Sequence, residues 1–196
     1  FNKLLKDIIV ISFRYSVICG KNPNDIERVY NNIAIQITTE KIYDKKRLKE
    51  VYIDDNEFVP IFSRKSFVDN SRNNKIIRYI LGKIERFSGG TREVNIDGNT
   101  DTIEHILPQN PDETWGEDYN FDNLIYRMGN LCLLEKVYNN ELKNKPYADK
   151  VILYNKSAFI STKQISEDYP IWNESTINHR QQKMSNCAKS IWKIEF

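Results

Sequence analysis

Hydrophobic residues recur at helical spacing in three stretches of the first half of the chain. The first stretch predicts a largely buried helix over residues 3–19, with apolar positions at Leu4, Ile8, Ile11, Tyr15 and Ile18 and a wider face from Leu5, Ile9 and Phe13. The second predicts a helix capped by Asn24, whose apolar face reaches Ile37. The third predicts an amphipathic helix from Arg72 to Phe87, ended by Ser88-Gly89-Gly90. The charge-rich residues 41–57 between them predict a helix followed by a loop.

After Gly90 the pattern changes from helical spacing to short alternation with an Asp97-Gly98 turn signal, and a β-branched run then leads into Glu104-His105. From Ser175 helical spacing returns, through Ile177, Met184, Ala188 and Ile191. The sequence therefore predicts an α+β fold that is mainly α-helical. We place a boundary near residue 92, between a helical region over 1–92 and a mixed region over 93–196. The apolar faces of the N-terminal helices are expected to pack on the C-terminal half, against the helix over 175–191.

Composition narrows the class of protein without indicating a ligand. The chain of 196 residues is 40% hydrophobic and carries a net charge of +2, so bulk charge does not indicate a polyanionic partner. Its three cysteines form no CxxC pair, which argues against a structural zinc site or a disulfide framework and fits a reducing compartment. Neither a membrane-spanning run nor a signal peptide is present, so we expect a cytoplasmic protein with no membrane partner. Because the chain begins inside a helical pattern without an initiator methionine, we expect a fragment of a longer protein.

The segment from Thr102 to Gln109 carries the candidate chemistry, because one of only two histidines in the chain stands there beside a carboxylate. Hydrolysis of a phosphodiester needs a base for the water and a cation on the phosphate, in an in-line geometry. A histidine with an ordinary pKa near ~6.5 is a suitable base. Mg²⁺ needs hard oxygen ligands and keeps several waters, so Glu104 and Asn139 would suffice. Adjacent strand residues point to opposite faces, so His105 and Glu104 reach one metal only if the strand bends, for which Pro108 is the candidate cause.

Three motifs follow one another in this half of the chain: Glu-His-Ile-x-Pro-Gln at 104–109, Gly-Asn-Leu-x-Leu-Leu-Glu at 129–135, and Asn-x-x-Leu-x-Asn-Lys at 139–145. Together they resemble the HNH, or His-Me finger, nucleases, and more narrowly the C-terminal nuclease domain of GmrSD-type, modification-dependent restriction enzymes. The resemblance runs from about Thr102 to the end of the chain, with further matching positions at Tyr147, Lys150, Tyr154, Ser157, Thr162, Trp172, Arg180 and Ile191-Trp192.

This resemblance implies a ββα element that holds a divalent metal ion, Mg²⁺ or alternatively Mn²⁺, between a hairpin and a helix. It makes His105 the general base and Glu104 a metal ligand. Asn130 would hold the loop by bonding backbone groups that fix the histidine. Asn139 would be the second metal ligand, with its neighbour Asn140 as the alternative if the register slips by one residue. Candidate phosphate contacts are Lys150 and Lys145.

The function implied is a metal-dependent endonuclease that cleaves DNA in a bacterial restriction or anti-phage system. Its partners would be DNA, including modified phage DNA, and an upstream sensor or nucleotide-hydrolysing domain of the same protein. The Asp-Gly-x-x-Arg signature of that domain does not occur in this sequence. Two alternatives remain open: an inactive nucleic-acid-binding or assembly module that keeps the fold, and an RNase with the same site.

Each motif taken singly has an ordinary structural explanation. A histidine at a strand end is usually structural, Gly-Asn-Leu is a common turn before a strand, and Asn139-Asn140 would serve as a helix cap. Their joint occurrence in order and at matched spacing favours the nuclease. The other histidine, His179, is predicted to be solvated. The remaining aromatic positions are interpreted as core residues: Tyr126, Tyr138, Tyr147, Tyr154, Trp172 and Trp192.

Overall fold

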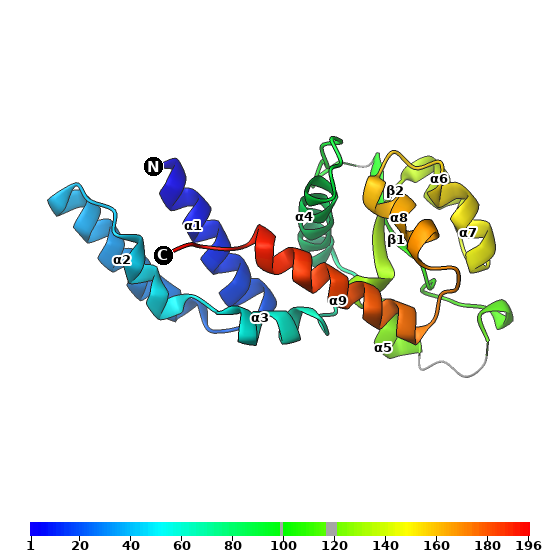
Figure 1. Cartoon of the computed structure of the whole chain (residues 1–196), viewed down its shortest axis with the longest axis horizontal. Coiled ribbons are helices and arrows are strands. Elements are labelled where there is room, and N and C mark those ends of the chain that lie inside the picture. The colour runs from blue at the N-terminus through cyan, green and yellow to red at the C-terminus, as the bar shows by residue number, and fades with distance from the viewer. Residues whose placement is uncertain (99, 117–120) are drawn as a thin grey trace. The chain divides into compact units, whose positions relative to one another are not determined.

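The computed structural model describes residues 1–98, 100–116 and 121–196. It confirms an α+β fold that is mainly helical (Figure 1). Contacts divide the chain into two compact units: residues 1–62 together with 188–196, and residues 63–187. Among the described residues, no helix is both long enough and apolar enough to cross a membrane.

The first unit is helical. It contains α1 (Asn2–Ser12), which continues as a π-helix (Phe13–Ile18), then α2 (Pro23–Glu40), a 3-10 helix (Lys45–Val51) and α3 (Asp55–Phe62). The C-terminal residues join this unit, where the Trp192 ring stacks on Phe13 with ring centroids 3.9 Å apart. The cap of α2 is Asn22, whose side chain accepts from the Asn24 N–H at 3.1 Å. The predicted cap was therefore wrong by two residues, because Pro23 occupies the first helical position, where its missing N–H costs nothing.

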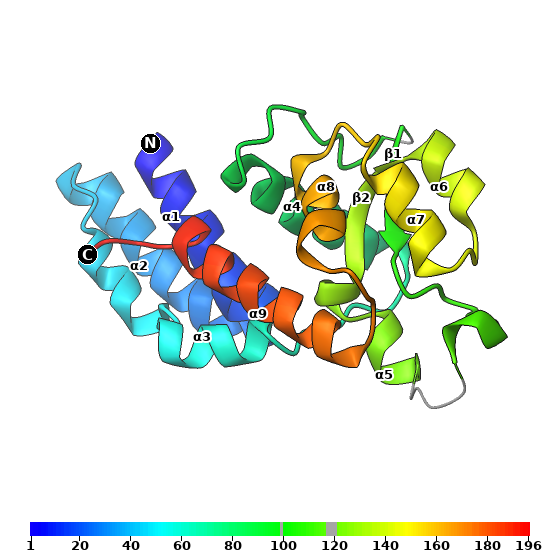
Figure 2. The ribbon, with the colours of Figure 1, turned by 45° about the vertical axis from the view of Figure 1, so that its right-hand side comes forward.

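The second unit is built on an antiparallel pair of strands. Strand β1 (Asp101–His105) pairs with β2 (Leu131–Glu135) from Asp101↔Glu135 to His105↔Leu131. Within the described ranges these two strands are the whole sheet. The helices of this unit are α4 (Ser71–Phe87), α5 (Phe121–Ile125), α6 (Lys136–Leu142), α7 (Tyr147–Tyr154), α8 (Ile160–Asp168) and α9 (Glu174–Ile191), whose last residues belong to the first unit. Helix α6 starts directly after β2 and contacts both strands, while α4 and α8 also contact β2 (Figure 2).

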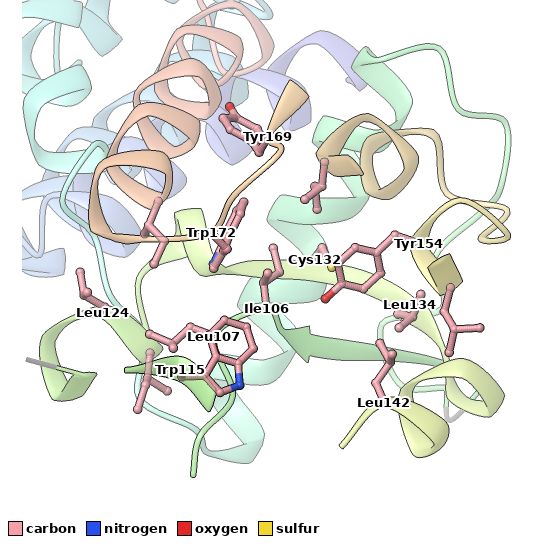
Figure 3. Close-up of a cluster of buried hydrophobic side chains, with 14 residues drawn as sticks. Ile106, Leu107, Trp115, Leu124, Cys132, Leu134, Leu142, Tyr154, Tyr169 and Trp172 are labelled. Atoms are coloured by element: carbon pink, nitrogen blue, oxygen red, sulfur yellow. The ribbon is translucent and has the colours of Figure 1, made fainter. Parts of the chain in front are cut away.

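The core of the second unit contains five of the six aromatic residues that the sequence predicted to be core, and the sixth, Trp192, lies in the first unit. Tyr154 and Trp172 belong to a cluster that also includes Ile106, Leu107, Cys132 and Leu134, and Figure 3 shows these side chains gathered along the strands. Tyr126, Tyr138 and Tyr147 are partly buried against this cluster. Because all four β2 residues from Leu131 to Leu134 are buried, β2 reads as a continuous apolar run instead of an alternating one.

The observed units divide the chain differently from the boundary suggested near residue 92. Helix α4 precedes that position but contacts β1, β2 and α8, so it lies in the same unit as the strands. The change from helical spacing to alternation after Gly90 marks a change of secondary structure within one unit. Periodicity reports local structure, whereas a domain boundary depends on long-range contacts.

Candidate active site

His105 is the last residue of β1, and its ring is half-buried beside a tyrosine. The ring meets the Tyr126 ring edge-on, with centroids 5.9 Å apart, and makes no hydrogen bond to the described part of the chain. Burial lowers the pKa of His105 to about 4, with the Asp69 carboxylate opposing this shift and Lys150 adding to it. The imidazole is therefore neutral at pH 7 and has a lone pair available to accept a proton.

A cleft of about 220 Å³ opens beside His105. Its walls are formed by residues 103–105 at the end of β1, by residues 108–110 after it, and by Asn139, Lys143 and Asn144 from α6 and the turn that follows. Four of these nine residues carry amide side chains, and Lys143 is an exposed cation. The cleft thus brings the candidate base together with oxygen donors and one positive charge.

Asn139 is fixed against β1 and reaches this cleft. Its Nδ2 atom donates to Thr102 Oγ1 at 2.7 Å and to the Ile103 carbonyl at 3.2 Å. The two donated bonds occupy both amide hydrogens and leave the Oδ1 atom as the remaining polar group. The adjacent Asn140 is exposed and does not line the cleft. Of the two candidate ligands, Asn139 is the one placed beside His105.

Glu104 and Lys150 lie elsewhere than the sequence predicted. Lys150 is 0% exposed, so it cannot meet a phosphate in this conformation, and its Nζ donates to Glu104 Oε1 at 2.7 Å. Glu104 is 4% exposed, and its Oε1 atom also accepts from the Tyr154 hydroxyl at 3.0 Å. Burial raises the pKa of Glu104, opposed by Lys150, by Tyr154 and by the His105 backbone N–H. The Glu104 Oε1 atom thus faces the core, because regular pairing continues as far as His105↔Leu131 and keeps the alternation of a strand, although Glu104 also forms part of the cleft wall.

The other predicted phosphate contact, Lys145, is exposed on the turn after α6 and lies 3.7 Å from the Glu141 carboxylate. It does not line the cleft, whereas Lys143 two residues earlier does. Lys143 is therefore the better-placed cation of this turn.

Asn130 holds the loop that follows His105. Its Oδ1 atom accepts from the Leu107 N–H at 2.8 Å and the Trp172 Nε1–H at 3.0 Å, and its Nδ2 atom donates to the Leu107 and Ile125 carbonyls, both at 2.9 Å. Its backbone carbonyl also accepts from the Ile106 N–H at 3.0 Å. The side chain is fully buried. Asn130 therefore determines the path of the chain directly after the candidate base.

Gly129 allows this loop to approach α9 closely. A Cβ atom at this position would lie 2.3 Å from the Ile177 carbonyl oxygen, a distance that real Cβ atoms do not reach. Arg180 of the same helix donates to the Gly129 carbonyl at 2.6 Å and to the Leu131 carbonyl at 2.9 Å. The Gly-Asn-Leu motif thus docks between β1 and α9 through its backbone.

Sequence reasoning missed Asp69, an exposed residue between α3 and α4. Its carboxylate accepts from Asn74 Nδ2 at 2.8 Å and from Gln109 Nε2 at 3.2 Å, and these bonds lower the pKa of Asp69. Gln109 lines the cleft, and the charge of Asp69 acts on His105. No motif surrounds Asp69, and its distance along the chain from His105 left no signal in the sequence.

Whether a divalent metal ion fits the cleft depends on the oxygen atoms of Asn139 and Glu104. Among the described residues, no group of three or more His, Cys, Asp or Glu side chains is arranged to hold a metal. The Asn139 Oδ1 atom fits one position of a hydrated Mg²⁺, which keeps several of its waters. The Glu104 carboxylate fits poorly, because Lys150 and Tyr154 already occupy its Oε1 atom and the Lys150 ammonium on the same carboxylate would repel a cation at Oε2.

Comparison with known proteins supports the resemblance carried by the motifs. The family model of the C-terminal domain of GmrSD restriction endonucleases matches residues 52–187. No match was found among curated proteins. The matched region covers more than half of the chain and includes both strands, α6 and every residue of the cleft. The chain therefore belongs to the family of GmrSD restriction endonuclease C-terminal domains.

Proposed function

We propose that this chain is the nuclease domain of a restriction enzyme and hydrolyses phosphodiester bonds of DNA at the cleft between the end of β1 and helix α6. The observation that carries this proposal is that the half-buried His105 imidazole and the Asn139 carboxamide line one cleft, although they come from different elements. The family to which the chain belongs consists of restriction endonuclease domains, which supports the same reaction.

His105 acts as the general base in this proposal. Because burial lowers its pKa to about 4, the imidazole is in its base form at neutral pH and accepts a proton from the attacking water. Lys143, which lines the cleft, supplies positive charge for the phosphate. Asn130 contributes indirectly, because its four side-chain bonds fix the loop that follows His105.

Metal dependence is part of the proposal. A bound Mg²⁺, or Mn²⁺ in its place, would stabilise the negative charge that develops on the phosphate. Asn139 Oδ1 is the protein atom proposed to hold it, since both hydrogens of that amide bond to β1. Waters and phosphate oxygens would complete the coordination.

The proposed partners follow from the family. A C-terminal domain of a restriction endonuclease implies another domain of the same protein, and we propose that this domain selects the DNA, including modified phage DNA, and hydrolyses a nucleotide. The proposed setting is bacterial defence in the cytoplasm.

A plasmid-cleavage assay tests the function. Supercoiled DNA, unmodified or carrying modified bases, is incubated with the chain in Mg²⁺, in Mn²⁺ and in EDTA, with RNA as a parallel substrate. His105→Ala should lower the rate by ~10²–10⁴-fold, as expected when a general base is lost. The matched control is His179→Ala, which changes the exposed histidine of α9 and should cleave like the wild type. Equal rates for His105→Ala and wild type, or binding of DNA without any cleavage, would contradict the proposal.

A further inference from the structure

Beneath His105, three polar side chains are almost completely buried, and one of them, Glu104, also belongs to the wall of the cleft. The side chain of Lys150 is 0% exposed and that of Glu104 is 5% exposed. Lys150 Nζ donates to Glu104 Oε1 at 2.7 Å and to the His105 backbone carbonyl at 2.8 Å, while the Tyr154 hydroxyl donates to Glu104 Oε1 at 3.0 Å. We call Glu104, Lys150 and Tyr154 the buried triad. Through Lys150, the triad is therefore hydrogen-bonded to the backbone carbonyl of His105, the candidate base.

Fold stability alone does not explain this arrangement. Two charged groups lose their hydration in the core, and an apolar set of similar volume is often as stable or more stable than a buried ion pair. Apolar side chains, however, cannot donate to the His105 carbonyl. The hydrogen bond from Lys150 to the His105 carbonyl is therefore what an apolar replacement of the triad would lose.

The bond acts at a position where the backbone is about to leave the sheet. His105 is the last residue of β1, and the next residues turn towards Pro108. The His105 carbonyl carbon is bonded to the Cα atom that carries the imidazole, and because the peptide unit is rigid, a displacement of this unit also moves Cα and with it the imidazole. A misplacement of about 1 Å at a reacting group can lower a rate by roughly 10²-fold. Fixing this carbonyl therefore bears directly on catalysis.

The same geometry argues against metal binding by Glu104. A divalent cation at Oε1 would have to displace both the Lys150 ammonium and the Tyr154 hydroxyl, and one at Oε2 would share a single carboxylate with that ammonium. The ammonium would also repel it, since the two cations would share a poorly hydrated site. Resting on the proposed nuclease function, we infer that the buried triad positions the His105 imidazole for catalysis and that Glu104 is not a ligand of the metal ion.

The first test separates positioning from stability in the whole chain. Glu104→Gln and Lys150→Met each leave part of the triad without its partner, so each should lower the thermal midpoint. The double variant Glu104→Gln/Lys150→Met removes both charges and should recover most of that midpoint. Its kcat should nevertheless stay ~10–10²-fold below wild type with an unchanged KM, because the bond to the His105 carbonyl is still missing. A folded double variant that cleaves at the wild-type rate would overturn the inference.

The second test concerns the metal. Mn²⁺ affinity, measured by calorimetric titration, should be unchanged in Glu104→Gln and lower in Asn139→Ala. High Mg²⁺ should restore part of the rate of Asn139→Ala but none of the rate of Glu104→Gln. Weaker Mn²⁺ binding by Glu104→Gln, or rescue of its rate by metal, would show that Glu104 is a ligand after all.

A third readout does not depend on cleavage. Lys150→Met should shift the NMR signals of the His105 imidazole and backbone, whereas the control Lys156→Met, at an exposed lysine just after α7, should leave them in place. If the wild-type chain cleaves no nucleic acid, the nuclease proposal fails, while these signals and the Mn²⁺ titration still decide on the triad. If the double variant does not fold, Tyr154→Phe replaces it, since it removes one hydroxyl only. Unchanged His105 signals in Lys150→Met would refute the positioning role. Unchanged His105 signals together with an unchanged kcat in Tyr154→Phe would also refute it.

Discussion

Removing the Asn130 carboxamide should destabilise the second unit strongly, because all four of its side-chain hydrogen bonds lie in the core. The Oδ1 atom accepts two bonds, from Leu107 and Trp172, and the Nδ2 atom donates two, to Leu107 and Ile125. Asn130 itself is 0% exposed, so water cannot replace these partners. At about 1 kcal/mol of net stabilisation for each bond, Asn130→Ala should lower the free energy of unfolding by about 4 kcal/mol.

Asn130→Asp tests the same bonds with almost no change of shape. The introduced carboxylate keeps both accepted bonds, but it turns the two donated bonds into contacts between oxygen atoms. Its pKa in the folded state should therefore lie above the unfolded value of about 4. The loss of stability is largest at a pH above the folded-state pKa and fades as the pH falls through it, because the protonated carboxyl can donate to one carbonyl. The deficit relative to wild type should thus be smaller at pH 5 than at pH 7.

The assay is urea unfolding followed by tryptophan fluorescence and circular dichroism at both pH values. Asn140→Asp is the matched control, since it makes the same change at an exposed position of α6. The control should stay close to wild type at both pH values. A loss below about 1 kcal/mol in Asn130→Ala would refute the hydrogen-bond argument. So would a deficit in Asn130→Asp that does not depend on pH.

Two further predictions concern the neighbours of this loop. Asn139→Ala should weaken Mg²⁺ binding in a titration, with part of the cleavage rate recovered at high metal concentration, while Asn140→Ala should behave like wild type. Gly129→Ala should lower the thermal midpoint, because its Cβ atom would come within 2.3 Å of the Ile177 carbonyl oxygen and overpacking of this kind typically costs about 1–3 kcal/mol. An unchanged midpoint in Gly129→Ala would show that α9 can move away from the loop.

The helices were largely predictable, since an amphipathic face repeats locally along the chain. Residues 3–19 were predicted as one helix and form α1 with its π-helical continuation, and residues 72–87 form α4 starting one residue earlier. The first residue of α2 was harder to predict, because Asn22 and Asn24 can both cap a helix. Pro23 favours the first helical position, which makes Asn22 the cap.

The partners within the site were not predictable, because they depend on contacts between distant segments. Nothing near Lys150 in the sequence indicates that it pairs with Glu104 instead of facing phosphate. Asp69 meets Gln109 across two different loops, with no shared motif. Asn130 was easier, because the family resemblance already implied that its amide bonds to the backbone groups around the loop.

Adjacency in a motif therefore does not imply a shared role. The sequence-based hypothesis required β1 to bend so that Glu104 and His105 could reach one metal, with Pro108 as the cause. Regular pairing instead continues through His105↔Leu131, and the chain leaves the sheet only afterwards. A bend that comes after both residues cannot turn one of them around, so strand alternation directs Glu104 Oε1 to Lys150 and Tyr154 in the core and leaves the imidazole at the cleft. Within one dipeptide, the His105 imidazole can thus face the substrate while Glu104, through Lys150, helps to hold the His105 backbone in place.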